Sequence, residues 1–236
     1  MNGGIFSAEK LQEAWLIIKA QLLLSIWETI YVTVLATLFA FIIGLPLGVI
    51  LVTGEKDGIH PLPSPLMKII NFIINVLRSI PFLILMILVM PLTRLITGTV
   101  VGTVPTIVPL VIAAFPFIAR LVETSLREVN HGTIEMAQSL GASTFQIVTK
   151  VMIRESIPSL INNMTIAMTT VLSYTAMSGI LGGGGLGKIA INYGYYRYKT
   201  LVMIVAVIFL IILVQLIQSI GTRLSIRVDR RIRNSR

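Results

Sequence analysis

The 236-residue chain contains no cysteine, and only 12% of its residues are Asp, Glu, Lys or Arg. Without cysteine it cannot be a disulfide-stapled secreted domain, nor can it build a cysteine zinc site. Hydrophobic residues make up 55% of the chain, which excludes a disordered protein. The few charges cannot cover the surface of a soluble domain. The composition therefore indicates an integral membrane protein.

Acidic residues are also scarce, since 10 of them face 19 basic ones and leave a net charge of +9. Such a balance fits either a nucleic-acid partner or a membrane protein whose basic residues lie on the cytoplasmic side. The long uncharged runs described next favour the membrane protein. We therefore expect contact with membrane lipid and no nucleic-acid partner.

Five runs are apolar enough to cross the hydrocarbon core, which takes about 20 helical residues. We predict an all-α membrane protein with one domain at 22–222, after an amphipathic segment at 1–21 and before a basic cytoplasmic tail at 223–236. Leu11, Ala14, Trp15 and Ile18 would share one face of the amphipathic segment. Glycine and proline inside the runs suggest kinked helices in a bundle. The expected spans are 25–52, 67–92, 97–120, 156–181 and 200–222.

Basic residues predict the orientation of these spans. If the five spans alternate, twelve Lys and Arg residues fall on one side and six on the other, with Arg78 inside a span. Six of the twelve lie in the C-terminal tail. The positive-inside rule then places the N-terminus outside the cell and the tail in the cytoplasm.

The segment at 128–155, between the third and fourth spans, is too polar for a simple connection. Residues 134–140 favour a helix, and Gly141 suits the left-handed conformation that ends one. Ser143 and Gln146 form a capping box that starts a second helix. Phe145, Val148, Val151 and Met152 would share one face of that helix. We predict a helix, a glycine turn and a helix, exposed in the cytoplasm.

This segment resembles the EAA loop of permease subunits in bacterial ABC importers. The resemblance rests on Glu135-Met136-Ala137, on Gly141 four residues later, and on Val151 ten residues after the glycine. In that family the loop carries the coupling helix, which docks into a cytoplasmic ATPase. Met136 departs from the usual alanine. The coupling residues that the resemblance implies are Glu135, Met136, Ala137, Ser139, Leu140, Gly141 and Ala142.

Further motifs are similar to those of the methionine branch of these importers. They are Arg78–Phe82, Phe115–Arg120, Tyr174–Gly179, Gly184–Gly187 and Tyr193–Tyr195. The resemblance implies a type I importer permease fold in a bacterial cell membrane, a homodimer, two ATPase subunits on the cytoplasmic side and an extracytoplasmic, often lipid-anchored, binding protein. ATP and Mg would be bound by the ATPase, and this chain would bind no cofactor and catalyse no hydrolysis.

A methionine zwitterion needs polar groups and a soft apolar site along its path. Tyr174 and Met177 are three residues apart on one helix face, and Ser173 and Ser178 lie beside them. We predict that these four residues form the gate or contact the substrate. Ordinary helix packing is the alternative. Arg78 is costly in hydrocarbon, and either it reaches the interface or it pairs with a carbonyl or a carboxylate, for which Glu28 and Glu123 are candidates.

Other chemistry finds little support in the sequence. Residues 182–188 read GGGGLGK, but a phosphate-binding loop needs Ser or Thr after the lysine and a preceding strand, so we expect a turn or close helix packing. His60 and His131 lie in separate loops, so we expect no metal site. The alternatives that stay open are an importer permease for another amino acid or small solute and, more distantly, an ion-coupled secondary transporter. An intramembrane enzyme lacks its catalytic motifs.

Overall fold

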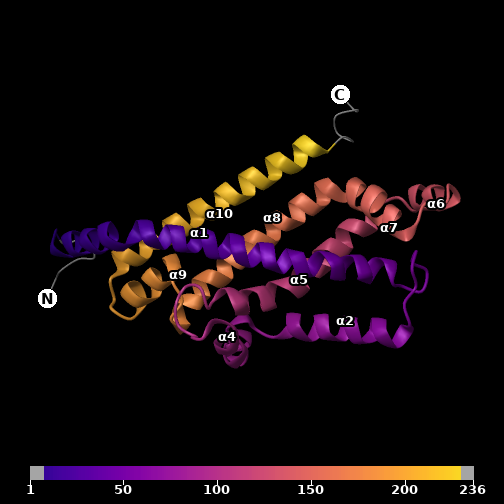
Figure 1. Cartoon of the computed structure of the whole chain (residues 1–236). Helices are drawn as coiled ribbons and strands as arrows, with labels where there is room; N and C mark the ends of the chain where they lie inside the picture. The colour runs from indigo at the N-terminus through magenta and orange to yellow at the C-terminus, as the bar shows by residue number, and fades with distance from the viewer. Residues whose placement is uncertain (1–7, 230–236) are drawn as a thin grey trace. The chain divides into compact units, whose positions relative to one another are not determined.

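A computed structural model describes residues 8–229, and Figure 1 shows a chain of helices joined by short connections. No β-strand occurs among the residues described. In chain order the helices are α1 (Ala8–Thr53), α2 (Ser64–Ser79), α3 (Phe82–Leu88), α4 (Met90–Thr97), α5 (Ile107–Arg127), α6 (His131–Ser139), α7 (Thr144–Gln146), the π-helix η1 (Ile147–Met152), α8 (Ile153–Ser178), the 3₁₀-helix η2 (Gly179–Leu181), α9 (Gly185–Ile189), the π-helix η3 (Ala190–Tyr195) and α10 (Thr200–Val228).

The chain forms two compact units. Unit 1 contains the described residues up to Thr37, together with Pro81–Ile112 and Met168–Ile217. Unit 2 contains Leu38–Ile80, Ala113–Ala167 and the described residues from Gln218 onward. Because α1, α5, α8 and α10 each contribute residues to both units, we describe the packing of each unit by itself.

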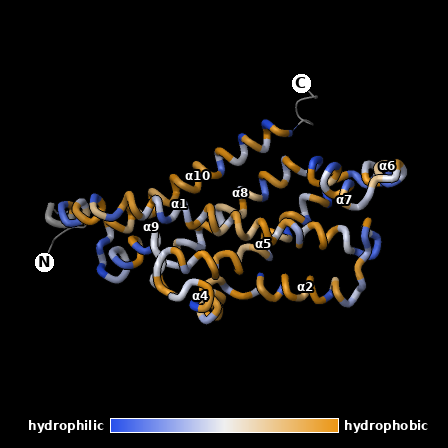
Figure 2. Tube along the Cα trace, viewed as in Figure 1, coloured by the Kyte–Doolittle hydropathy of each residue, from blue (hydrophilic) through white to orange (hydrophobic). Residues whose placement is uncertain are grey.

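Four helical segments are long and apolar enough to cross a membrane. If the bent pair α2 and α3 is counted as one broken span, the number of candidate spans rises to five. The hydrophobic colouring along α1, α5 and α10 in Figure 2 reflects this composition, and hydrophilic residues gather in the connections. The predicted all-α membrane class is confirmed. The four segments are Leu11–Thr53, Ile107–Arg127, Thr144–Leu181 and Thr200–Val228.

The predicted span at 67–92 is not one continuous helix. Ile80 is extended (φ −81°, ψ 125°), because the following proline disfavours the helical conformation in the residue before it. Pro81 precedes α3, and Pro91 occupies the first turn of α4, where a missing N–H costs nothing. Similarly, the predicted span at 97–120 begins as a helix only at Ile107, because the left-handed Gly98 ends α4.

The predicted N-terminal segment is the beginning of α1 rather than a separate helix. Its residues 1–7 lie outside the described part of the chain. Ala14 is buried against Ile189 and Val202, whereas Leu11 and Trp15 are exposed. The residues of the predicted apolar face are therefore partly packed within unit 1 and partly exposed.

The predicted basic tail likewise begins as helix, since Arg223 and Arg227 belong to α10. The remaining tail arginines, Arg230, Arg231, Arg233 and Arg236, lie outside the residues that the structure describes.

In unit 2, α1 approaches α5 at two glycines one turn apart. A Cβ atom at Gly44 would lie 2.8 Å from Cγ2 of Ile118, and one at Gly48 would lie 2.6 Å from Cβ of Val122. Both distances are too short for real side chains, so only glycine fits at this contact. Small residues spaced in this way let membrane helices approach closely, and dispersion contacts then hold them together.

In unit 1, α1 carries a buried polar ladder of Ser25, Thr29, Thr33 and Thr37. Each threonine hydroxyl donates a hydrogen bond of 2.7–2.8 Å to the carbonyl four residues earlier. These bonds satisfy the hydroxyl donors inside an otherwise apolar helix, where an unpaired polar group would be costly.

Candidate functional site

The polar corner between α5 and α8 has the predicted organisation. Asn130 caps α6, its side-chain oxygen accepting from the N–H of Gly132 at 2.8 Å. Gly141 adopts φ +77° and ends the helical turn, as expected for a left-handed cap. Ser143 and Gln146 form a reciprocal capping box at the start of α7. The corner lies in unit 2 and is labelled α6 and α7 in Figure 1.

The predicted coupling residues divide into a buried base and an exposed tip. Ala137 is buried and helps to anchor α6, as Ile134 does. Leu140 is 80% exposed and Phe145 is 76% exposed, and Met136 is also open. Three large apolar side chains at an exposed corner are unusual for a surface that meets only water.

The polar members of the set brace α6 itself. A carboxylate oxygen of Glu135 lies 3.0 Å from Nδ1 of His131, one turn earlier. Ser139 donates to the carbonyl of Glu135 at 2.9 Å, and the N–H of Ala142 reaches the carbonyl of Ala137 at 3.1 Å. A Cβ atom at Gly141 would have no neighbour within 4 Å, so only the backbone conformation constrains that position.

The predicted apolar face after Ser143 is wrong only at its first residue. Phe145 is exposed and Ile147 is buried instead. Met152 is buried as predicted, and Val148 and Val151 are half-buried. The reason for the difference at Phe145 is the π-helix η1 at Ile147–Met152, whose wider turn shifts the residues after Phe145 relative to a regular α-helix.

Two arginines of α5 connect this helix to α2 and to the loop after α1. Arg127 pairs with Glu55 and with Glu123, the latter at 2.8 Å. Arg120 donates to the side-chain oxygens of Asn71 at 2.7 Å and Asn75 at 3.0 Å. It also pairs with Glu123 at 2.7 Å. The elements next to the corner are therefore joined by a polar network within unit 2, which no motif in the sequence indicated.

The carboxylates proposed as partners for Arg78 bind elsewhere. Glu123 pairs with the two α5 arginines, and Glu28 accepts from the hydroxyl of Thr103 and the N–H of Gly185. The Arg78 side chain is exposed at the end of α2, which fits a cation that reaches the membrane interface.

The four predicted path residues lie in unit 1 but do not share one surface. Ser173 and Met177 line an apolar groove of about 530 Å³ between α8 and α10. Tyr174 is instead stacked on Phe82 of α3, with ring centroids 4.5 Å apart and planes within 6° of parallel. Ser178 is buried and donates to the carbonyl of Thr175 at 2.7 Å.

The glycine-rich segment after α8 is the expected tight turn. Gly182 has φ +85° and Gly185 has φ +79°, conformations that favour glycine. A Cβ atom at Gly179 would lie 2.6 Å from the carbonyl carbon of Gly187, so the two backbones are in close contact.

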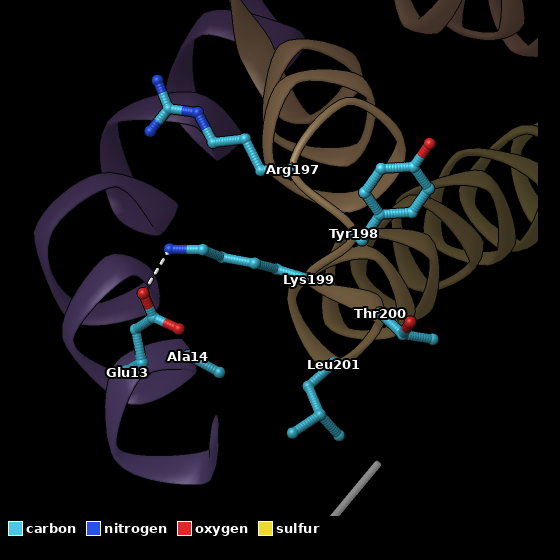
Figure 3. Close-up of a pocket in the computed structure, with 7 residues that line it drawn as sticks. All are labelled: Glu13, Ala14, Arg197, Tyr198, Lys199, Thr200 and Leu201. Carbon is cyan, nitrogen blue, oxygen red and sulfur yellow. Dashed lines mark hydrogen bonds and ion pairs between the residues drawn. The ribbon is translucent and has the colours of Figure 1, made fainter. Parts of the chain in front are cut away.

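A second pocket in unit 1, of about 200 Å³, lies where the turn before α10 meets α1 (Figure 3). Lys199 reaches across to Glu13 at 2.6 Å. The guanidinium of Arg197 lies 4.8 Å above the ring of Tyr193, and Gln21 donates to the hydroxyl of Tyr193 at 2.8 Å. Within residues 8–229 no cluster of three His, Asp or Glu side chains could hold a metal ion.

Comparison with known proteins places the chain in a family. The model of the family described as "Binding-protein-dependent transport system inner membrane component" matches residues 44–234. A probable D-methionine transport system permease of Vibrio cholerae is 48% identical over 221 residues, covering 92% of this chain and 96% of that protein. The corresponding protein of Pasteurella multocida is 44% identical and covers 88% and 95%.

Solved structures agree with these relatives. The permease chain in an inward-facing structure of the MetNI methionine ABC transporter is 42% identical, with a TM-score of 0.88 over 90% of this chain and 98% of that one. An amino acid ABC transporter crystallised with histidines has a TM-score of 0.73 at 17% identity, which supports the fold alone. The chain therefore belongs to the family of binding-protein-dependent transport system inner membrane components, as a membrane-embedded permease of the ABC importer class and not as an enzyme.

Proposed function

We propose that this chain forms the translocation path of a methionine importer, working as a homodimer with two ATPase subunits beneath it. The assignment of methionine as the substrate rests on the 48% identity to a D-methionine permease over 92% of the chain. The partner ATPase would bind ATP and Mg, and an extracytoplasmic binding protein would deliver methionine.

Uptake into proteoliposomes that contain the permease, its ATPase and the binding protein tests the substrate. We expect labelled methionine to accumulate only with ATP inside, and unlabelled D- or L-methionine to compete. Faster uptake of another amino acid would instead support the alternative importer. Uptake driven by an ion gradient without ATP would contradict the proposal.

We propose that the exposed tip formed by Met136, Leu140 and Phe145 is the surface that enters the ATPase. Its apolar side chains are held away from their own unit by the buried Ile134 and Ala137, a pattern suited to insertion into a groove of a partner. If the ATP-bound and ATP-free forms of the ATPase contact this tip differently, ATP binding would shift the permease between its inward-facing and outward-facing states.

A matched pair of glycine variants tests this docking surface. Gly141 (φ +77°) and Gly98 (φ +75°) are both left-handed, and a Cβ atom at either would have no neighbour within 4 Å. Gly141→Glu and Gly98→Glu therefore impose the same backbone strain, but only the first adds charge at the tip. We expect Gly141→Glu to lose co-purification with the ATPase and Gly98→Glu to keep it. Retention of the ATPase by Gly141→Glu would contradict the assignment.

We propose that Ser173 and Met177 line the substrate path. Tyr174 and Ser178 would hold α8 in place through their packing and hydrogen bonding, without contacting the substrate. Met177→Ala should lower methionine uptake per ATP hydrolysed, because it removes a soft side chain from the groove. Tyr174→Phe keeps the stack on Phe82 and should transport normally, whereas Tyr174→Ala should not. Normal transport by both Met177→Ala and Tyr174→Ala would overturn this path.

A further inference from the structure

The long apolar helix α1 contains one carboxylate between Glu13 and Glu55, and that carboxylate is Glu28. A carboxylate in such a helix is costly unless hydrogen bonds satisfy it. Both of its oxygens are used. Oε1 accepts from the hydroxyl of Thr103 at 2.9 Å, and Oε2 accepts from the N–H of Gly185 at 2.7 Å.

The neighbouring residue makes the same connection. The hydroxyl oxygen of Thr29 accepts from the N–H of Leu186 at 2.9 Å, while it donates to the carbonyl of Ser25. The first two N–H groups of α9 are therefore capped by α1 and not by their own N-cap residue, Gly184, which has no side chain to do so. Residues 157 positions apart in sequence hold this turn in place.

The contact is built closely around the carboxylate. A Cβ atom at Gly184 would collide with the Thr103 hydroxyl and lie 2.6 Å from Oε2 of Glu28. A Cβ atom at Gly185 would lie 2.5 Å from the hydroxyl of Thr29. The glycines of the GGGGLG segment thus leave room for the acidic side chain of α1.

The turn follows α8 after the three residues of η2, and hydrogen bonds join it to the end of α8 and to the segment before α5. The N–H of Gly183 donates to the carbonyl of Ser178 at 3.0 Å, and the N–H of Gly102 donates to the carbonyl of Gly182 at 3.0 Å. Ser178 follows Met177, which lines the groove. The chain of contacts from Glu28 to the groove lies entirely within unit 1.

We propose that Glu28, with Thr29, is a positioning residue for the transport path: it fixes the glycine-rich turn and through it the end of α8 that carries Ser173 and Met177. This proposal rests on the proposed path. Loss of the two contacts frees the turn, so that α8 no longer presents the groove in one arrangement. The effect falls on how much solute moves for each ATP hydrolysed.

A pair of threonine variants gives the sharpest test. Thr29 and Thr33 are 3% and 1% exposed, and both donate to a carbonyl of α1, but only Thr29 also accepts from another segment. Thr29→Val and Thr33→Val therefore make the same buried change and differ in that one bond. We expect Thr29→Val to lower methionine moved per ATP severalfold and Thr33→Val to leave it unchanged.

Substitutions of Glu28 extend the test. Glu28→Ala removes both acceptors and should lower transport per ATP at least about tenfold, the loss expected from removing even one charge-assisted hydrogen bond. Glu28→Gln keeps an oxygen for Gly185 and can donate to the Thr103 hydroxyl, so it should restore most of the coupling. A role in assembly alone would lower transport and ATP hydrolysis together and leave their ratio unchanged.

Amide hydrogen exchange in the purified permease provides a readout independent of any transported solute. The N–H groups of Gly185 and Leu186 should exchange faster in Glu28→Ala than in the parent chain. Faster exchange with an unchanged transport ratio would overturn the positioning role. If the parent transports no methionine, the proposed function fails while the exchange result still decides whether Glu28 holds the turn. Should Glu28→Ala fail to assemble, the threonine pair decides the question.

Discussion

Left-handed backbone conformations among residues 8–229 occur at five glycines and at one other residue, Tyr198, with φ +56°. Tyr198 lies between the cation Arg197 above Tyr193 and the cation Lys199 paired with Glu13, and its own side chain is 88% exposed. The anchored neighbours hold Tyr198 in a conformation that costs about 1–2 kcal/mol for a residue with a Cβ atom.

The strain at Tyr198 can be measured with two substitutions. Tyr198→Ala keeps the Cβ atom and the strain, whereas Tyr198→Gly removes both. We expect the glycine variant to be about 1 kcal/mol more stable than the alanine variant in thermal unfolding of the detergent-solubilised permease. Equal unfolding temperatures for the two variants would mean that this residue relaxes at no cost.

At the residue scale, the sequence predicted those features that depend on near neighbours. Gly141 and the Ser143–Gln146 capping box follow from conformational preferences within four residues, and both predictions are confirmed. The partner of Glu28 could not be predicted in this way, because Gly185 is brought to it by tertiary packing. The carboxylate itself was a usable signal, since a charge in an apolar helix points to a functional site.

At the scale of elements, the capping box determines how firmly α7 begins. Ser143 accepts from the N–H of Gln146, and Gln146 accepts in return from the N–H of Ser143 at 2.9 Å. Without this pair the corner would rely on Gly141 alone to set the direction of the chain after α6.

Ser143→Ala should destabilise the start of α7 by about 0.5–2 kcal/mol. We expect faster hydrogen exchange at the amides of Thr144–Gln146 and weaker ATPase binding, because the tip is less well ordered. Thr149→Ala is the control, since the Thr149 hydroxyl donates only to the carbonyl of Phe145 and caps no N–H. Equal exchange in the two variants would show that the box contributes nothing.

The contact of α1 with α5 gives a second prediction at this scale. Gly48→Leu would place a side chain where even a Cβ atom lies 2.6 Å from Val122, so the two helices must separate. We expect at least several kcal/mol of destabilisation and loss of the folded permease in size-exclusion chromatography. Ile42→Leu, at an exposed position of the same helix, should elute as the parent chain does.

Hydropathy alone predicted the long helices, because about 20 uninterrupted apolar residues leave few other structures in a membrane. It could not predict that the prolines of the second run break it completely into α2, α3 and α4, since kinked helices carry the same residues. The π-helices at Ile147–Met152 and Ala190–Tyr195 have no simple sequence signal, and at the first of them Ile147 is buried in place of the predicted Phe145.

At the scale of the whole molecule, the orientation in the membrane stays a prediction from the basic residues. The absence of cysteine makes it simple to test, because any introduced cysteine is the only thiol in the chain. Ser139 in the docking corner and Tyr195 before α10 are both exposed positions for such a label.

We expect a membrane-impermeant maleimide to label Tyr195→Cys in intact cells and to label Ser139→Cys only after the membrane is permeabilised. This result follows if the side with twelve basic residues is cytoplasmic. Labelling of Ser139→Cys but not of Tyr195→Cys in intact cells would reverse the orientation. It would also remove the docking corner from the reach of a cytoplasmic ATPase.

The polar ladder of α1 has a mechanical consequence. The hydroxyls of Thr33 and Thr37 bond to carbonyls of their own helix, so donor and acceptor move together and the bonds survive when α1 turns as a rigid rod. The bonds made by Glu28 and Thr29 to the glycine-rich turn have no such freedom, since each joins two segments. A displacement of α1 against the glycine-rich turn would therefore break the bonds of Glu28 and Thr29 but leave those of Thr33 and Thr37 intact.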